Sequence, residues 1–115
     1  MVDVAIRLAE QFGRHIADAD YDAAHSLLTK TARQKYTVES FKQSFEQMTA
    51  YEPGPIQRVQ VDPEFVLEDW PAKMADDIAS VYVGLLGEEY VEAVTLVVSR
   101  EDGDVRVRDV EWGRP

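Results

Sequence analysis

The sequence of 115 residues contains no cysteine and only two histidines. The absence of cysteine excludes disulfide bonds, thiolate metal ligands and a cysteine nucleophile. No apolar run approaches the roughly 18–20 residues that a membrane-spanning helix needs. The N-terminal stretch has no basic segment followed by an apolar block, so we expect no signal peptide and a cytoplasmic location. Glycine-rich phosphate loops and nucleophile elbows are also missing, and we predict no cofactor.

Basic residues are scarce relative to acidic ones. The chain has 12 lysines and arginines against 22 aspartates and glutamates, which gives a net charge of −10. Residues 56–115 hold 14 acidic and 6 basic residues, so most of the excess lies there. Because an acidic surface repels phosphate backbones and anionic lipids, we expect neither a nucleic-acid nor a membrane partner. A basic partner protein stays possible, and solubility alone also accounts for the charge.

The remaining composition is that of a folded domain. With 45% apolar and 30% charged residues, a chain of this length is expected to form one domain, residues 1–115. The apolar period changes from helical to alternating near Tyr51–Pro55. This order predicts an α+β fold in which three N-terminal helices pack on a curved antiparallel sheet of about four strands.

The helices are predicted from apolar stripes and start signals. The first covers about residues 3–17, and Gly13 within it indicates close approach by another element. The second begins after Asp20, a short helical piece lies near residues 31–36, and the third begins after its predicted cap Thr37. The inward positions of the first and third helices are Ala5, Leu8, Ala9, Phe12, Ile16, Val38, Phe41, Phe45 and Met48.

Four strands are expected, near residues 56–68, 78–86, 90–100 and 104–112. Short turns join the last three, which predicts an antiparallel meander. Pro63 lies inside the first strand, which favours an edge or a bulge there. The strand near 90–100 is apolar on both faces. Helices cover one face. The other apolar face also needs a cover, so we expect a partner there, most simply a second copy of the chain.

The last strand contains a change of phase. Val105 and Val107 occupy odd positions, whereas Val110 and Trp112 occupy even ones. An alternating pattern keeps one face buried through such a slip only if an extra residue is inserted. We therefore predict a β-bulge near residues 108–109 that bends the sheet.

Three stretches carry a resemblance to a known family. They are AIRLAEQFGRHIADADYDAAHSLLT (5–29), YTVESFKQSFEQM (36–48) and VRVRDVEW (105–112). Together they resemble the nuclear transport factor 2-like superfamily, whose members have a cystatin-like α+β cone with a pocket inside. The resemblance implies this fold over most of the chain. It implies no activity, because the superfamily contains isomerases, cyclases, hydrolases, adaptors and immunity proteins, and their catalytic residues do not map onto this sequence.

The aspartates around residue 20 are better explained by helix capping than by metal binding. Asp18, Asp20 and Asp22 match positions 1, 3 and 5 of a calcium-binding loop. Position 6 is then Ala23 instead of glycine, and position 12 is Thr29 instead of glutamate. We therefore predict no metal site. Asp20 is a natural N-cap and Asp22 a favourable acid of the first turn.

Catalytic candidates are His15, Glu92 and Asp109. His15 lies one step from the apolar stripe of the first helix. Glu92 lies on the bulky face of its strand, where an apolar cavity would raise the pKa of its carboxyl group. Asp109 lies at the predicted bulge, which can re-aim it. Each also has a structural explanation, since an exposed helix histidine and solvent-facing strand acids are common.

Seven aromatic residues are candidates for lining a pocket, or else for the core or an interface. They are Phe12, Tyr36, Tyr51, Trp70, Tyr82, Tyr90 and Trp112. The leading functional hypothesis is a small domain that binds an apolar ligand in the cone and forms a homodimer through the sheet. The alternatives are a cofactor-independent enzyme of the isomerase, cyclase or hydrolase kind, and an acidic protein-interaction module of the immunity type.

Overall fold

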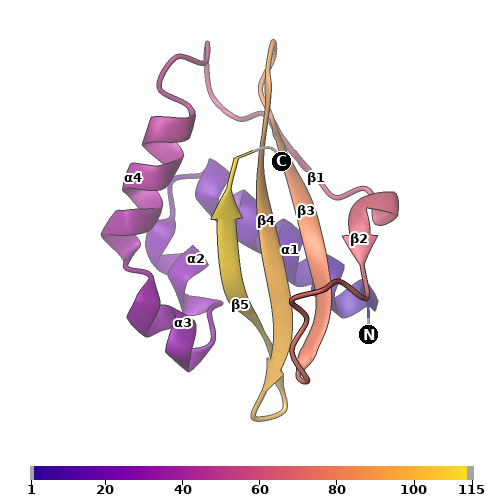
Figure 1. The fold of residues 1–115 in the computed structure, drawn as a ribbon. Coiled ribbons are helices and arrows are strands. Elements are labelled where there is room, and N and C mark those ends of the chain that lie inside the picture. Colours follow the sequence, from indigo (N-terminus) through magenta and orange to yellow (C-terminus); the bar gives the residue numbers. More distant parts are fainter. Residues whose placement is uncertain (1, 114–115) are drawn as a thin grey trace.

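The computed structural model describes residues 2–113 and has the predicted α+β architecture. Four helices precede an antiparallel sheet of five strands (Figure 1). The helices are α1 (Val2–Ala17), α2 (Tyr21–Ser26), α3 (Lys30–Lys35) and α4 (Val38–Met48). The strands are β1 (Arg58–Gln60), β2 (Val66–Leu67), β3 (Asp77–Leu86), β4 (Val91–Glu101) and β5 (Asp104–Trp112).

The first strand differs from the expectation at Pro63. Instead of one strand over residues 56–68, the chain forms β1 and β2, separated by the 3₁₀ turn η1 (Pro63–Phe65). Both short strands pair with β3, on the edge that β4 leaves free: β1 pairs with residues 84–86 and β2 with residues 80–81. The sheet order is therefore β1-β3-β4-β5, with β2 off this path. Proline has no N–H to donate to a ladder, and the Asp62 carboxylate accepts a hydrogen bond from the Glu64 N–H at 2.9 Å, which favours the turn. The predicted edge position is confirmed.

The helix count also differs, because the short piece after the second helix is a helix in its own right. Thr29 caps α3 by accepting a hydrogen bond from the Ala32 N–H at 3.2 Å. The predicted caps of the other helices are confirmed. Asp20 accepts from the Ala23 N–H, and Thr37 forms a capping box with Ser40.

One face of the sheet carries the core. On β3 the inward residues Ala79, Val81, Val83 and Leu85 are fully buried, and α1 packs across them. The remaining helices lie beside β5 (Figure 1). Aromatic rings fill the space between helices and sheet. The largest fully buried side chains of the core are Phe12, Phe41, Ile16, Leu28, Leu85 and Leu96.

The predicted bulge in β5 is confirmed at residue 108. Val97 pairs with Asp109 and the adjacent Val98 pairs with Val107, so Arg108 has no partner in the ladder. The insertion lets Val107 and Val110 both lie buried despite their opposite phase. It also leaves Arg108 and Asp109 together on the opposite face of the sheet.

Gly13 lets α1 approach the sheet closely. A β-carbon at this position would lie 2.7 Å from Cγ1 of Val59 and 3.0 Å from Cγ1 of Val83. We predict that Gly13→Ala lowers the free energy of unfolding by about 1 kcal/mol, because the steric cost of roughly 1–3 kcal/mol exceeds the helix-propensity gain of about 1 kcal/mol. Urea denaturation measures this change.

Gln11→Ala, on an exposed position of the same helix, is the matched control and should leave stability nearly unchanged. The double variant Gly13→Ala/Val59→Ala removes the closest clash, so the alanine at 13 should cost less in that background. A Gly13→Ala protein as stable as the parent would contradict the close-approach explanation.

Candidate functional site

The sheet face opposite α1 is open and arranged in cross-strand rows. Tyr82 pairs with Thr95, and Thr95 pairs with Glu111, so these three side chains form one outward row across β3, β4 and β5. The next row has almost no side-chain bulk, because Gly84 pairs with Ala93 and the Gly113 N–H donates to the Ala93 carbonyl at 2.9 Å.

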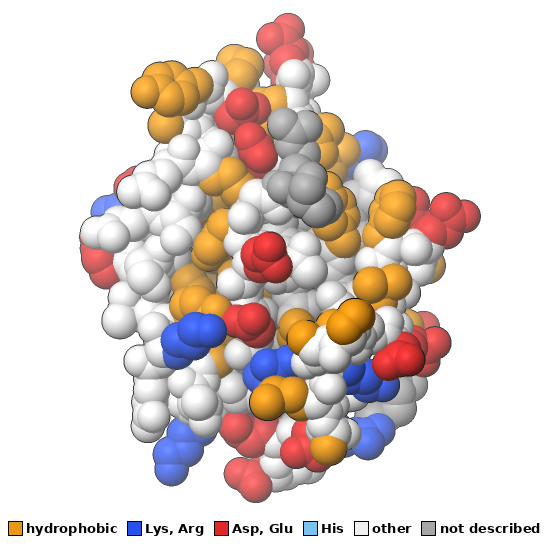
Figure 2. All heavy atoms as spheres, viewed as in Figure 1, with side chains coloured by type: hydrophobic (Ala, Val, Ile, Leu, Met, Phe, Trp, Pro, Cys, Tyr) orange, Lys and Arg blue, Asp and Glu red, His pale blue; other side chains and the backbone are white. Residues whose placement is uncertain are grey.

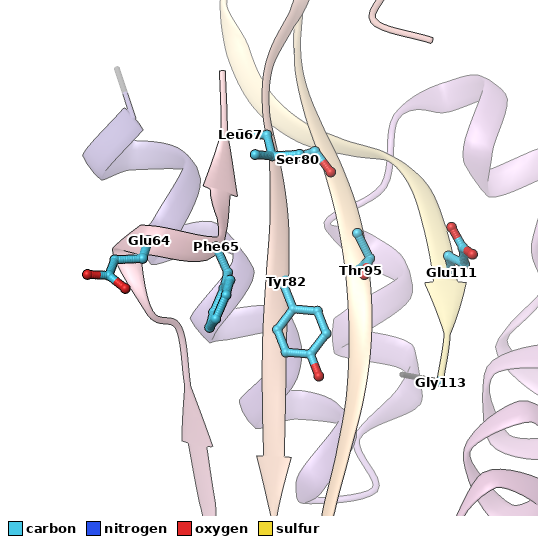
Figure 3. Close-up of a pocket in the computed structure, with 8 residues that line it drawn as sticks. All are labelled: Glu64, Phe65, Leu67, Ser80, Tyr82, Thr95, Glu111 and Gly113. Atoms are coloured by element: carbon cyan, nitrogen blue, oxygen red, sulfur yellow. The ribbon is translucent and has the colours of Figure 1, made fainter. Parts of the chain in front are cut away.

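A groove of about 520 Å³ lies on the open face along the row of Tyr82, Thr95 and Glu111, and Gly113 is one of the residues that line it (Figure 3). Its apolar lining comes from Phe65 of η1, Leu67 of β2 and Tyr82 of β3. Ser80 and Thr95 contribute hydroxyl groups. This volume is within the range of about 300–1,000 Å³ that is typical of small-molecule sites.

The apolar side chains of the groove are unusually accessible. Phe65 is 57% exposed and Leu67 is 50% exposed. The rings of Phe65 and Tyr82 meet edge to face with centroids 5.9 Å apart, so the turn after Pro63 supplies a wall to the aromatic floor on β3. Large exposed apolar groups that converge on one hollow indicate a binding surface.

A second concavity of about 520 Å³ is polar and lies where α3 meets the beginning of β3 and the bulge of β5. Its central group is Asp77, whose side chain is fully buried. Arg108 donates to both carboxylate oxygens of Asp77 at 2.8 Å, Ser99 donates from its hydroxyl group, and the Met74 N–H donates at 2.8 Å. Burial raises the pKa of Asp77, but these hydrogen bonds outweigh it and hold the pKa below its usual value.

Asp109, which lines the same concavity together with Lys35, also contacts a tyrosine. The Tyr36 hydroxyl donates to the Asp109 carboxylate, and Lys35 Nζ lies 3.5 Å from the same oxygen. Burial, reinforced by the hydrogen bond to Asp109, raises the pKa of Tyr36, so this residue keeps its proton at neutral pH. The Tyr36 hydroxyl and the Lys35 ammonium group therefore both already have a partner within the protein, the Asp109 carboxylate.

The three predicted catalytic residues do not gather in one place. Asp109 lines the polar concavity. His15 lies half-buried in the last turn of α1, and Glu92 lies half-buried near the start of β4, opposite Leu85. Neither lines the groove or the polar concavity.

Of the seven aromatic candidates, Tyr82 lines the groove. Phe12 and Trp112 pack with Phe41 in the core. Tyr51 is 98% exposed, and Trp70 lies half-buried in the loop after β2, with Lys73 Nζ 5.9 Å from its ring centroid.

The hydroxyl groups of the two remaining tyrosines form hydrogen bonds within the protein. Tyr90 donates from its hydroxyl group to the Gly54 carbonyl at 2.9 Å, and Tyr36 is bound at Asp109. The candidates therefore spread over the core, the loops and the groove.

Sequence reasoning did not single out Phe65, Leu67, Thr95 and Glu111 as groove residues. Alternation along the strands could have indicated two of them, because it places Thr95 and Glu111 on the face opposite their buried neighbours. The break at Pro63 hid the rest, because the 3₁₀ turn decides where Phe65 points. The partnership of Asp77 with Arg108 was also missed, since no local spacing links residues so far apart in sequence.

Comparison with known proteins identifies no relative: no family model, curated protein or solved structure matches the chain. The family resemblance therefore stays a prediction. Among residues 2–113, no helix has the length and apolar character to cross a membrane, and no group of three or more histidine, aspartate or glutamate side chains is arranged to hold a metal ion.

The Asp77 network predicts a pH-dependent loss of stability. At pH 7, Asp77→Asn should lower the free energy of unfolding by about 2–3 kcal/mol, because it breaks a buried ion pair whose arginine is partly solvated. The folded-state pKa of Asp77 is lowered, so its contribution is complete above the unfolded pKa of about 3.9 and disappears as the pH falls through the folded value. The difference between parent and variant should therefore shrink below about pH 4.

Asp76→Asn, at the exposed neighbouring residue, is the matched control and should stay within about 0.5 kcal/mol of the parent in urea denaturation at each pH. An Asp77→Asn difference that is the same at pH 3 and pH 7 would show that the carboxylate charge is not what stabilises the fold.

Proposed function

We propose that this domain binds a small ligand with an apolar body in the groove on the open face of its sheet. The observation that carries the proposal is the convergence of Phe65, Leu67 and Tyr82 on a hollow of about 520 Å³. The proposal keeps the sequence-based expectation of an apolar ligand but moves the site. The interior between helices and sheet is filled by buried side chains such as Phe12 and Phe41, whereas the open face has unfilled space.

Membership in the nuclear transport factor 2-like superfamily is part of the same proposal. It is supported by the order of helices followed by an antiparallel meander, and by the bulge in the last strand. A cone in the sense of that superfamily would place the helices on the inner face of the bent sheet. The proposed groove lies on its other face.

A second copy of the chain is the competing occupant of this face. The exposed apolar groups Phe65, Leu67 and Val91 favour it. A twofold interface over the groove would, however, cover Glu64 and Glu111, and no cation is among the described groove residues to pair with them, which is unfavourable.

The acidic interaction module has less support on this side of the molecule. Figure 2 shows the acidic side chains of this side in several separate groups, with other side chains between the groups, and not as one continuous acidic surface. The enzyme alternative would use the Tyr36–Asp109 pair, in which the tyrosine hydroxyl already donates to the carboxylate. We therefore place ligand binding first.

Binding of a neutral fluorescent probe tests the groove directly. N-phenyl-1-naphthylamine should bind the parent, and Tyr82→Ala should weaken binding by roughly 3–10-fold, because one aromatic contact contributes about 0.5–1.5 kcal/mol beyond its area. Thr95→Trp should fill the groove and abolish binding without loss of stability, since residue 95 is half-exposed on the outward row. Fluorescence titration and urea denaturation measure both.

Tyr51→Ala is the matched control, because it removes an equally large ring that is 98% exposed and outside the groove. Equal probe affinity in Tyr82→Ala and the parent would contradict the proposal. Sedimentation velocity separates the competing occupant: a stable dimer that Leu67→Asp converts to a monomer, with no probe bound by the parent, would assign the face to self-association instead.

A further inference from the structure

The charged groups at the groove all have the same sign. Glu64 stands at one end of the lining and Glu111 at the other, with Phe65, Tyr82 and Thr95 between them (Figure 3). No lysine or arginine is among the described residues that line the groove. Lys35, Arg100 and Arg108 line the polar concavity instead.

Glu111 is positioned to meet a ligand that lies on the aromatic floor. It belongs to the same cross-strand row as Thr95 and Tyr82. Directly opposed side chains in such a row have β-carbons about 5 Å apart, so a charge held near Thr95 is within reach of Glu111. Glu111 and Glu64 are both exposed and make no ion pair with any residue between 2 and 113.

The aromatic lining and the electrostatic field of the whole protein both favour a positively charged ligand. Tyr82 and Phe65 can offer ring faces to a cation, an interaction worth about 0.5–1 kcal/mol at exposed sites. The chain has a net charge of −10, with −8 in residues 56–115, so its field attracts cations and repels anions. Neutral hydroxyl acceptors at Ser80 and Thr95 complete a lining that can accept hydrogen bonds from an ammonium group.

We propose that the groove selects amphipathic organic cations: an aromatic or alicyclic body on Phe65, Leu67 and Tyr82, with an amine directed at Glu111. This inference rests on the proposed function, because it names the class of ligand for the same groove. It excludes fatty acids and other amphipathic anions as preferred ligands, although they have equally large apolar bodies.

Three probes with one body and different charges test the inference. They are 2-naphthylmethylammonium, 2-naphthylmethanol and 2-naphthoate, titrated by ¹H–¹⁵N NMR into the full chain. At about 20 mM salt the ammonium should bind at least ~3-fold more tightly than the alcohol, and the carboxylate more weakly than the alcohol. At about 0.5 M salt the difference should nearly vanish, since exposed charges are then screened.

Charge-neutralising variants locate the selectivity. Glu111→Gln should lower the affinity for the ammonium probe to nearly that for the alcohol probe. The affinity for the alcohol should stay the same. Glu10→Gln is the matched control: it removes the same charge at an exposed position of α1, behind the opposite face, and should change neither affinity. Arg114→Gln removes the cation that follows Gly113 in sequence, and the ammonium preference should persist or increase.

The outcomes separate the inference from the proposed function. If the alcohol shifts the amide resonances of Tyr82 and Thr95 but the ammonium binds no more tightly, charge selection is wrong while ligand binding in the groove stands. The same conclusion follows if Glu10→Gln loses as much affinity as Glu111→Gln. If no probe shifts these resonances, both the proposed function and the inference fail.

Discussion

The ion pair between Asp77 and Arg108 joins elements that no local pattern connects. Asp77 begins β3, Arg108 is the inserted residue of β5, and Ser99 of β4 donates to the same carboxylate. The Met74 N–H adds the loop that returns from β2. Because the Asp77 side chain is fully buried, removing any of these donors would leave part of its charge uncompensated. One carboxylate thus fixes three strands and a loop at one end of the open face.

The ion pair between Asp77 and Arg108 explains why the open face has two regions of different chemistry. The bulge places Arg108 and Asp109 together on that face, and their contacts with Asp77 and Tyr36 make the end near α3 polar. Beyond the bulge, β5 returns to regular alternation, so Glu111 stands beside Thr95 and Tyr82. The apolar groove and its acidic ends therefore begin where the charged network stops.

The sequence predicted most of the fold because its signals are local. The stripe Phe12–Ile16 indicated α1, the cap Thr37 indicated α4, and the phase slip after Val107 located the bulge. The groove was beyond such reasoning, because it depends on how the turn at Pro63 brings Phe65 onto Tyr82. The partner of Asp77 was likewise unpredictable, since alternation says which face a residue occupies but not which distant charge it meets.

Urea denaturation of a variant that lacks Arg108 most directly tests the role of the Asp77–Arg108 ion pair. Without Arg108, Val105, Val107, Val110 and Trp112 fall into one phase, so the strand can form without a bulge while Asp77 loses its cation. We expect the deletion to lower the free energy of unfolding by about 3 kcal/mol, and we expect the addition of Asp77→Asn to recover a large part of the loss. A deletion variant as stable as the parent, or one that Asp77→Asn destabilises further, would contradict this role of the ion pair.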